Sequence, residues 1–180
     1  MLKRRTLKVA ALQLDAHDRD AFASVWPHIG KQIQLAAAGG AQLIVLPEGT
    51  VPGYVIGNAP IDSSITDRAL QDVQGIAQRA KVVVVYGSVR SHQNFIFNSA
   101  FVVDSDGSLA GIADKCFLWH FDRQWFAAGK VAPPISTRLG NLGVMICADG
   151  RIPTIARTLV DEGAQLLVMP TAWVTSGRDQ

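Results

Sequence analysis

Short apolar runs rich in branched side chains alternate along this chain with longer segments that contain Ala, Gln and Arg. Glycine or proline bounds the apolar runs, as is usual for strands, whereas the longer segments have the length and composition of helices. The pattern predicts helices over residues 21–38, 65–79 and 153–162, and strands over residues 7–14, 43–46, 82–88, 98–103, 143–147 and 166–169. Because strands alternate with helices, we expect an α/β fold built from βαβ units.

One connection has the composition of a tight turn. Residues 104–107, Asp-Ser-Asp-Gly, separate the strand predicted at 98–103 from a further apolar run at 109–112. Asp-Gly favours the two-residue turn of a hairpin. We therefore expect one antiparallel pair of strands among otherwise parallel ones.

A short repeat divides the chain into two halves. Residues 40–47 (GAQLIVLP) and 163–170 (GAQLLVMP) are identical at six of eight positions, and each segment follows a predicted strand and helix. This indicates two related βαβ units, although independent convergence of two buried strands on a similar composition is the alternative. Open α/β sheets place their chemistry at the carboxyl ends of parallel strands, and the residues at such ends are Gln13, Glu48, Cys147 and Trp173.

Length and charge narrow the class of protein. A chain of 180 residues with 48% hydrophobic and 18% charged residues has the composition of a globular protein, and we expect a single domain over residues 1–180. The formal net charge is only +2, and the one dense basic cluster, Lys3, Arg4 and Arg5 with Lys8, is typical of a solvated terminus. We therefore expect no nucleic-acid partner.

The apolar runs are also far shorter than the roughly 20 residues of a membrane-spanning helix. The run after the basic N-terminal residues is interrupted by Gln13 and Asp15, which is unlike a signal peptide. From these features we expect no membrane association and a cytoplasmic location.

The two cysteines, Cys116 and Cys147, cannot build a disulfide framework, and neither has a second Cys or a His at metal-ligand spacing. Each is either a buried apolar residue or a reactive thiol. Cys147 stands between a predicted strand and a helix that begins with Pro153, close to Arg151. A helix N-terminus and a cation both lower the pKa of a thiol, which is what a nucleophilic cysteine needs. These residues alone favour the alternative, an inert cysteine at the end of a buried strand.

Two further residues have side chains suited to catalysis. Glu48 follows the apolar run 43–47, where a carboxylate at the end of a buried strand is suited to act as a general base. Lys115 begins an aromatic-rich segment, where a fixed ammonium group can stabilise an oxyanion. A surface glutamate and a solvated lysine are the respective alternatives.

Taken together, these contexts resemble the carbon-nitrogen hydrolase family, also called the nitrilase superfamily, whose catalytic residues are Glu, Lys and Cys in that chain order. The resemblance covers nearly the whole chain, and its most specific part is the segment 143–153 around the cysteine. The other matching segments are residues 9–13, 46–48, 98–100, Lys115 with the aromatic residues after it, Arg157 and residues 163–173.

The resemblance implies an αββα sandwich and a hydrolase of non-peptide carbon-nitrogen bonds. In it, Glu48 takes the thiol proton, Cys147 attacks the substrate carbon to form a thioester, and Lys115 stabilises the tetrahedral anion. The backbone N–H of Ala148 is a candidate second donor to that anion. No metal or organic cofactor is implied.

The sequence departs from the family pattern in two respects. Asp122 stands where many members have a second glutamate, and its carboxylate is one methylene shorter. The family sandwich also contains strands and helices beyond the Trp173 region, so the C-terminal part of the second half is expected to be missing. A shortened, non-catalytic homologue that acts as a binding or assembly subunit is therefore the second hypothesis.

The residues after the cysteine bear on the substrate. True nitrilases usually have Trp-Glu there, whereas this chain has Ala148-Asp149, which resembles amidases and N-carbamoyl-amide hydrolases. We therefore expect a small amide or N-carbamoyl substrate, with a nitrile as the alternative. A nucleotide-binding module is the weakest hypothesis, because no glycine-rich phosphate loop follows any predicted strand.

Aromatic residues near the predicted strand ends are candidates for the substrate pocket, although ordinary core packing is the alternative for each. They are Tyr54, Trp119, His120, Trp125 and Trp173. The family typically pairs two sandwiches through the helix after the nucleophile. We therefore expect a homodimer or larger homo-oligomer that uses residues 153–162, with Arg157 and Arg151 near the contact.

Overall fold

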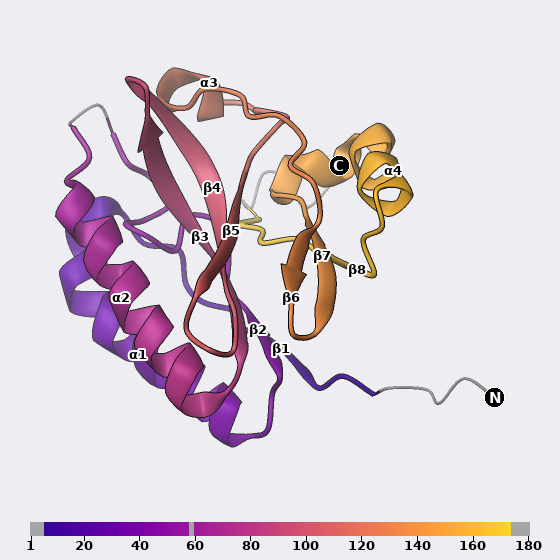
Figure 1. Ribbon diagram of the computed structural model, residues 1–180. Helices are drawn as coiled ribbons and strands as arrows, with labels where there is room; N and C mark the ends of the chain where they lie inside the picture. The colour runs from indigo at the N-terminus through magenta and orange to yellow at the C-terminus, as the bar shows by residue number, and fades with distance from the viewer. Residues whose placement is uncertain (1–5, 58–59, 174–180) are drawn as a thin grey trace.

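The computed structural model describes residues 6–57 and 60–173 (Figure 1). The basic residues Lys3, Arg4 and Arg5 lie outside the described residues. Two sheets and the helices that cover their outer faces make up the described part of the chain, which confirms the predicted α/β class.

The first sheet has five strands in sequential order: β1 (Val9–Ala11), β2 (Leu43–Val45), β3 (Val83–His92), β4 (Phe95–Val103) and β5 (Leu109–Asp114). The strands β1, β2 and β3 are parallel, whereas β4 and β5 continue the sheet as antiparallel neighbours. Two long helices, α1 (Phe22–Ala38) and α2 (Ser63–Ala80), connect the parallel strands and lie side by side on one face (Figure 1). A 3-10 turn over Arg19–Ala21 precedes α1.

The second sheet has three strands in the order β6 (Ile135–Thr137), β7 (Gly140–Val144) and β8 (Leu166–Val168). A 3-10 turn, η2 (Cys147–Arg151), and helix α4 (Pro153–Asp161) connect the parallel strands β7 and β8. The short helix α3 (Asp122–Trp125) lies in the connection between the two sheets.

Three apolar clusters show that the layers stack as helices, sheet, sheet and helix. The face of the first sheet that carries Ile44 and Val84 packs against α1 and α2. The opposite face, with Val83 and Val85, packs against Leu142 of the second sheet. The remaining layer is α4, whose buried residues pack with Met145 in the third cluster.

The repeat seen in the sequence has the same backbone environment in both sheets. Leu43 pairs with Val9 in the first sheet, and Leu166 pairs with Leu142 in the second. The glutamine before each of these leucines accepts a hydrogen bond from the backbone N–H of the residue before the leucine's strand partner. These bonds join Lys8 N to Gln42 Oε1 (3.2 Å) and Asn141 N to Gln165 Oε1 (3.1 Å). The two segments therefore occupy equivalent places in two βαβ units.

Several predicted element boundaries were wrong. The antiparallel hairpin of β4 and β5 was predicted, but the hairpin of β3 and β4 was not, because its turn residues Gln93 and Asn94 adopt positive φ without an adjacent glycine. The strand predicted to reach Cys147 ends at Val144, and the strand predicted over residues 7–14 contains only three paired residues. The short hairpin of β6 and β7 was also missed.

Within the described residues, no helix has both the length and the apolar character needed to cross a bilayer.

Candidate active site

Glu48 lies just beyond the carboxyl end of β2, in a loop that crosses the neighbouring strand. The backbone N–H of Gly87 donates to the carbonyl of Pro47 at 3.1 Å. A Cβ at Gly87 would lie 2.5 Å from that carbonyl oxygen, so only glycine lets the loop lie this close to β3. The loop brings the carboxylate into the interior, where the Glu48 residue is only 2% exposed.

Lys115 reaches the same place from the end of β5. Its backbone N–H donates to the carbonyl of Asn98 at 2.8 Å, which makes the two residues cross-strand neighbours. Their side chains both donate to one oxygen of Glu48: Lys115 Nζ lies 2.6 Å from Oε1, and Asn98 Nδ2 lies 2.8 Å from it. The base and the ammonium group proposed from sequence therefore form a buried ion pair.

Asp122 is the second anion beside Lys115. It begins α3, and its Oδ2 accepts hydrogen bonds from Lys115 Nζ at 2.6 Å and from the backbone N–H of Trp119 at 3.0 Å. The shorter carboxylate therefore reaches the lysine. Burial alone lowers the pKa of Lys115, but the charges of Glu48 and Asp122 and the hydrogen bonds to both outweigh it, so the pKa is raised above its ordinary value.

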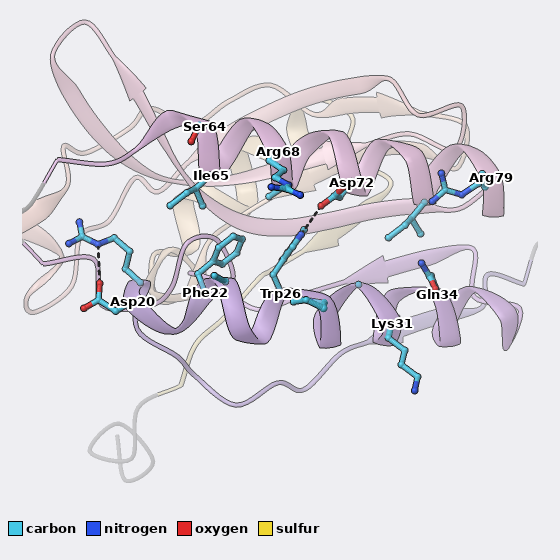
Figure 2. Close-up of a pocket in the computed structure, with 16 residues that line it drawn as sticks. Asp20, Phe22, Trp26, Lys31, Gln34, Ser64, Ile65, Arg68, Asp72 and Arg79 are labelled. Carbon is cyan, nitrogen blue, oxygen red and sulfur yellow. Dashed lines mark hydrogen bonds and ion pairs between the residues drawn. The ribbon is translucent and has the colours of Figure 1, made fainter.

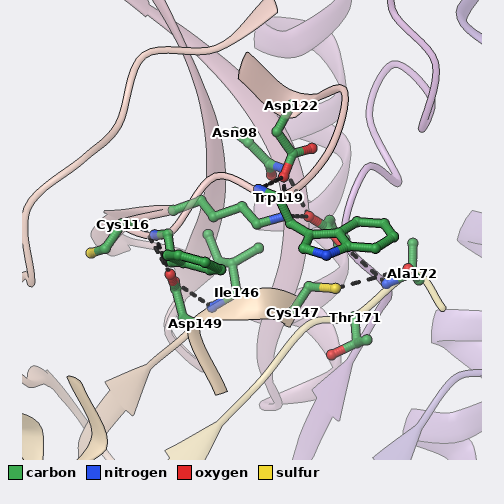
Figure 3. Close-up of polar contacts among 12 residues, drawn as sticks. Asn98, Cys116, Trp119, Asp122, Ile146, Cys147, Asp149, Thr171 and Ala172 are labelled. Atoms are coloured by element: carbon green, nitrogen blue, oxygen red, sulfur yellow. Dashed lines mark hydrogen bonds and ion pairs between the residues drawn. The ribbon is translucent and has the colours of Figure 1, made fainter. Parts of the chain in front are cut away.

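Cys147 opens the η2 turn in a left-handed backbone conformation, with φ of 47°. Its N–H donates to the carbonyl of Pro170 at 3.0 Å, and its thiol lies 3.9 Å from the carbonyl oxygen of Ala172. The N–H of Ala172 in turn donates to Glu48 Oε2 at 3.2 Å (Figure 3). One residue of the segment after β8 therefore contacts both the thiol and the carboxylate.

The expected direction of the Cys147 pKa shift was wrong. Burial, followed by the negative charge of Glu48 and a hydrogen bond to it, raises the pKa of the thiol to about 12, although Lys115 opposes the shift. Helix α4 begins only at Pro153, and the Arg151 guanidinium packs over the rings of Trp119 and Trp173. The thiol is therefore protonated at neutral pH and needs a base that takes its proton during attack.

A cavity of about 20 Å³ lies beside the thiol. Tyr54, Trp119, Ala148 and Trp173 line it, as the sequence predicts, together with Lys115, Cys147, Arg151 and Ala172. The prediction was wrong for two aromatic residues: His120 is exposed and packs against Trp119 and Phe121, while Trp125 packs against Phe121. The phenol of Tyr54 is close enough to the site for burial and the charges of Glu48 and Asp122 to raise its pKa.

Three residues of the site were not predicted as functional: Asn98, Ala172 and Asp149. Asn98 carried one signal, since it and Ser99 are the two polar residues of an otherwise apolar strand. Asp149 carried another as an acid next to the buried strand end. Ala172 contributes only backbone groups, so its side chain gives no signal in the sequence.

Larger cavities also occur in the described part of the chain, and one of them adjoins the cavity beside the thiol. One, of about 730 Å³, borders the other side of Glu48 and is lined by Gln13, Tyr54 and Trp173 among others. The other, of about 1040 Å³, is a surface groove between α1 and α2, where Trp26 Nε1 donates to Asp72 Oδ2 at 2.9 Å (Figure 2). The groove contains neither cysteine and neither of the carboxylates that hold Lys115, and the cavity of about 730 Å³ is lined by Glu48 but not by Lys115 or Cys147. The small cavity is lined by both Lys115 and Cys147 and is therefore the candidate active site.

Comparison with known proteins identifies this arrangement. The profile of the carbon-nitrogen hydrolase family matches residues 8–179. A probable nitrilase from Schizosaccharomyces pombe is 33% identical over 139 residues, which are 73% of this chain and 50% of that protein. An (R)-stereoselective amidase from a Pseudomonas species is 27% identical over 167 residues, 91% of this chain and 59% of that protein.

A solved structure shows the same fold. A variant of the amidase from a Nesterenkonia species, with the acetamide moiety of fluoroacetamide bound covalently to its active-site cysteine, superposes with a TM-score of 0.81 at 25% identity. The match covers 92% of this chain and 64% of that one. The present chain thus spans between half and two thirds of the length of these relatives. It belongs to the carbon-nitrogen hydrolase family.

Proposed function

We propose that this chain carries the catalytic site of an amidase that hydrolyses a small amide or N-carbamoyl compound through a thioester on Cys147. The observation that carries the proposal is the buried contact of Lys115 with both Glu48 and Asp122 beside the thiol. A lysine with two buried anionic partners keeps its charge, and a fixed cation next to a nucleophile is suited to stabilise an oxyanion.

In the acylation step, Glu48 takes the proton of the Cys147 thiol as the sulfur attacks the carbonyl carbon of the amide. The carbon–oxygen π electrons move to oxygen, and the resulting anion is stabilised by Lys115 Nζ and the backbone N–H of Ala148. Collapse of this intermediate breaks the carbon–nitrogen bond. The leaving nitrogen takes the proton from Glu48, so ammonia or an amine departs and the acyl thioester remains.

Deacylation repeats these steps with water as the nucleophile. Glu48 takes a proton from a water molecule as its oxygen attacks the thioester carbon, and the second tetrahedral anion is stabilised by the same donors. The carbon–sulfur bond then breaks, and the sulfur recovers its proton from Glu48. The products are a carboxylic acid and the starting enzyme, and for an N-carbamoyl compound the acid is carbamic acid.

An amide is favoured over a nitrile by the residues after the nucleophile, Ala148 and Asp149, and by the similarity to amidases. The acetamide adduct on the cysteine of the Nesterenkonia amidase supports the choice of Cys147 as nucleophile. The cavity beside the thiol has aromatic walls of Tyr54, Trp119 and Trp173, which suit the apolar part of an organic acyl group.

We further propose that the protein is a homodimer that associates through α4. Ile155 and Leu159 of this helix are buried against the second sheet and its neighbours, whereas Val160 of the same helix is 54% exposed. Arg157 and Asp161 form an exposed ion pair one turn apart on its surface. An exposed apolar side chain flanked by an ion pair is a surface suited to contact the same helix of a second copy.

The proposal is tested by ammonia release from acetamide, propionamide and N-carbamoylglycine, with Cys147→Ala as the inactive control. In parallel, the folded protein is treated with iodoacetamide and its peptides are mapped. We expect ammonia from at least one substrate and labelling of Cys147 ahead of Cys116, because the side chains of Lys115 and Glu48 act on the Cys147 thiol, whereas Cys116 has the carboxylates of Asp149 and Asp114 near it. Labelling confined to Cys116 would overturn the assignment, and labelling of Cys147 without ammonia release would favour the non-catalytic binding subunit.

A further inference from the structure

Asp149 is a buried carboxylate that accepts three backbone hydrogen bonds. Its Oδ1 accepts from the N–H groups of Cys116 at 3.0 Å and Phe117 at 2.7 Å, and its Oδ2 accepts from the N–H of Ile146 at 2.9 Å (Figure 3). The residue is only 1% exposed. A buried carboxylate with three amide donors holds the backbone of the donor residues in place, because each donor that lost its partner would be buried without a hydrogen bond at a cost in free energy.

The three donors belong to the two segments that carry the proposed chemistry. Cys116 and Phe117 directly follow Lys115, which extends from the first sheet, and Ile146 directly precedes Cys147, which follows a strand of the second sheet. The carboxylate thus joins the two sheets at the point where the ammonium group and the thiol meet.

The backbone at Cys147 has particular need of such support. Its φ of 47° lies in the left-handed region, which is unfavourable for a residue with a side chain. The hydrogen bond from Ile146 to Asp149 and the bond from Cys147 N to Pro170 O hold the residues on and before this turn. Loss of the first would let the turn relax and move the thiol.

We propose that Asp149 is a positioning residue that sets the distance between Lys115 Nζ and the reacting atoms at Cys147. This inference rests on the proposed amidase function, because it assigns to Asp149 the alignment of the two groups that stabilise and form the tetrahedral anion. Asp149 does not contact the substrate. Its effect is on kcat, since a misplacement of about 1 Å in a catalytic group costs on the order of 100-fold in rate.

The chain contains a matched control. Asp104 is also a buried carboxylate that joins the two sheets through backbone amides: it accepts from Ser105 N at 2.6 Å and from Arg138 N at 3.0 Å. Arg138 lies in the turn between β6 and β7, away from the cavity beside Cys147. A variant at Asp104 therefore reports the structural cost of losing such a link without disturbing the site.

The experiment compares Asp149→Asn with Asp104→Asn in the full chain. In Asp149→Asn the amide keeps one acceptor oxygen but turns an NH2 group toward the remaining donor. We expect kcat for the best amide substrate to fall by roughly 100-fold, with KM changed by less than about threefold. Asp104→Asn should lower the thermal midpoint comparably while kcat stays within about twofold of the unsubstituted protein.

A second readout does not depend on turnover. Lys115 opposes the upward shift of the Cys147 pKa, so separation of the two groups should move the pH profile of iodoacetamide labelling at Cys147 to higher pH in Asp149→Asn and leave it unchanged in Asp104→Asn. If Asp149→Asn does not fold, Asp149→Glu retains the charge and the acceptors while moving them by one methylene, and the same shift and loss of kcat are expected.

The possible results distinguish a failure of the positioning role of Asp149 from a failure of the proposed amidase function. Unchanged kcat and an unchanged labelling profile in a folded Asp149 variant would overturn the positioning role, as would equal losses of kcat in the Asp104 variant. If the unsubstituted protein releases no ammonia from any amide, the proposed function fails. The labelling profile then still decides whether Asp149 aligns Lys115 with Cys147.

Discussion

Lys115 and Asn98 are paired across two antiparallel strands and donate to the same oxygen of Glu48, at 2.6 and 2.8 Å. That oxygen, Oε1, is held by an ammonium and an amide, whereas Oε2 accepts from the N–H of Ala172. The two oxygens therefore have different tasks. Oε1 fixes the carboxylate in place, and Oε2, bonded to the residue whose carbonyl faces the thiol, is the oxygen suited to take a proton.

Glu48→Gln should affect hydrolysis and thiol reactivity in opposite directions. Without a base, kcat should fall on the order of 10³-fold. The charge of Glu48 raises the pKa of Cys147, so its removal should lower that pKa from about 12 and move iodoacetamide labelling of Cys147 to lower pH. Ammonia release and peptide mapping across a pH series measure both effects. A variant with unchanged kcat would exclude Glu48 as the base.

Asn98→Ala tests whether Oε1 must be held by two donors. The variant leaves Lys115 as the side-chain donor to this oxygen, and we expect kcat to fall about tenfold, the ~1.4 kcal/mol of one hydrogen bond to a charged group. KM should stay nearly constant, because Asn98 is not among the residues that line the cavity. Asn141→Ala, at a half-buried asparagine outside the site, is the control. A change in KM alone would contradict this role.

The sequence predicted the helices better than the strands, for a physical reason. The periodic apolar face of α1 extends over most of its 17 residues and defines a helix almost without reference to the rest of the chain. Strand ends depend on partners that are distant in sequence. The strand predicted to reach Cys147 ends at Val144. The N–H groups of Met145 and Cys147 still donate to the carbonyls of Val168 and Pro170, but Pro170 has no N–H to donate in return, so the regular ladder stops.

The residues of the site also differ in whether their role can be inferred from the neighbouring sequence. Three residues act through their side chains and stand in sequence motifs that can be compared with the motifs of a family: Glu48, Lys115 and Cys147. Ala172 acts through its backbone, so no sequence pattern could reveal it. The direction of the Cys147 pKa shift depends on burial and on the charge of Glu48, which lies 99 positions earlier in the chain. The prediction used only the nearby helix N-terminus and Arg151, and these gave the wrong direction.

Lys115→Met should destabilise the fold strongly. It leaves Glu48 and Asp122 as two buried carboxylates without their shared cation, and breaking a buried ion pair in this manner typically costs about 3–5 kcal/mol. Because the pKa of Lys115 is raised on folding, this stabilisation is complete below the unfolded value of about 10.4 and is lost only as the pH rises through the folded pKa.

Urea unfolding at several pH values measures this effect. The difference in the free energy of unfolding between the unsubstituted protein and Lys115→Met should be full at pH 7 and 9 and should decrease only in strongly alkaline solution. Equal stability of the two proteins at pH 7 would show that the ion pairs contribute nothing net to folding.

Tyr86→Phe should leave the fold intact and stabilise it. The Tyr86 hydroxyl is buried in the core of the first sheet and has no hydrogen-bond partner within the described residues, while its ring packs on Phe101. Removal of an unsatisfied buried hydroxyl should raise the free energy of unfolding by about 1 kcal/mol. Thermal unfolding of Tyr86→Phe is compared with Tyr86→Leu, which loses ring packing and should be less stable. A lower midpoint for Tyr86→Phe would show that the hydroxyl has a bound partner, such as water.

Association through α4 is tested by substituting two apolar residues that are equally exposed but lie on different outer helices of the sandwich. Val160 on α4 is 54% exposed and Leu35 on α1 is 55% exposed. If α4 forms the contact between copies, Val160→Lys places a charge in the interface of each partner, and the dissociation constant of the dimer should rise at least tenfold, about 1.4 kcal/mol. Leu35→Lys should leave it unchanged. Light scattering and sedimentation at several protein concentrations measure both variants. Equal effects of the two substitutions would move the interface away from α4, and a monomer at every concentration would remove it.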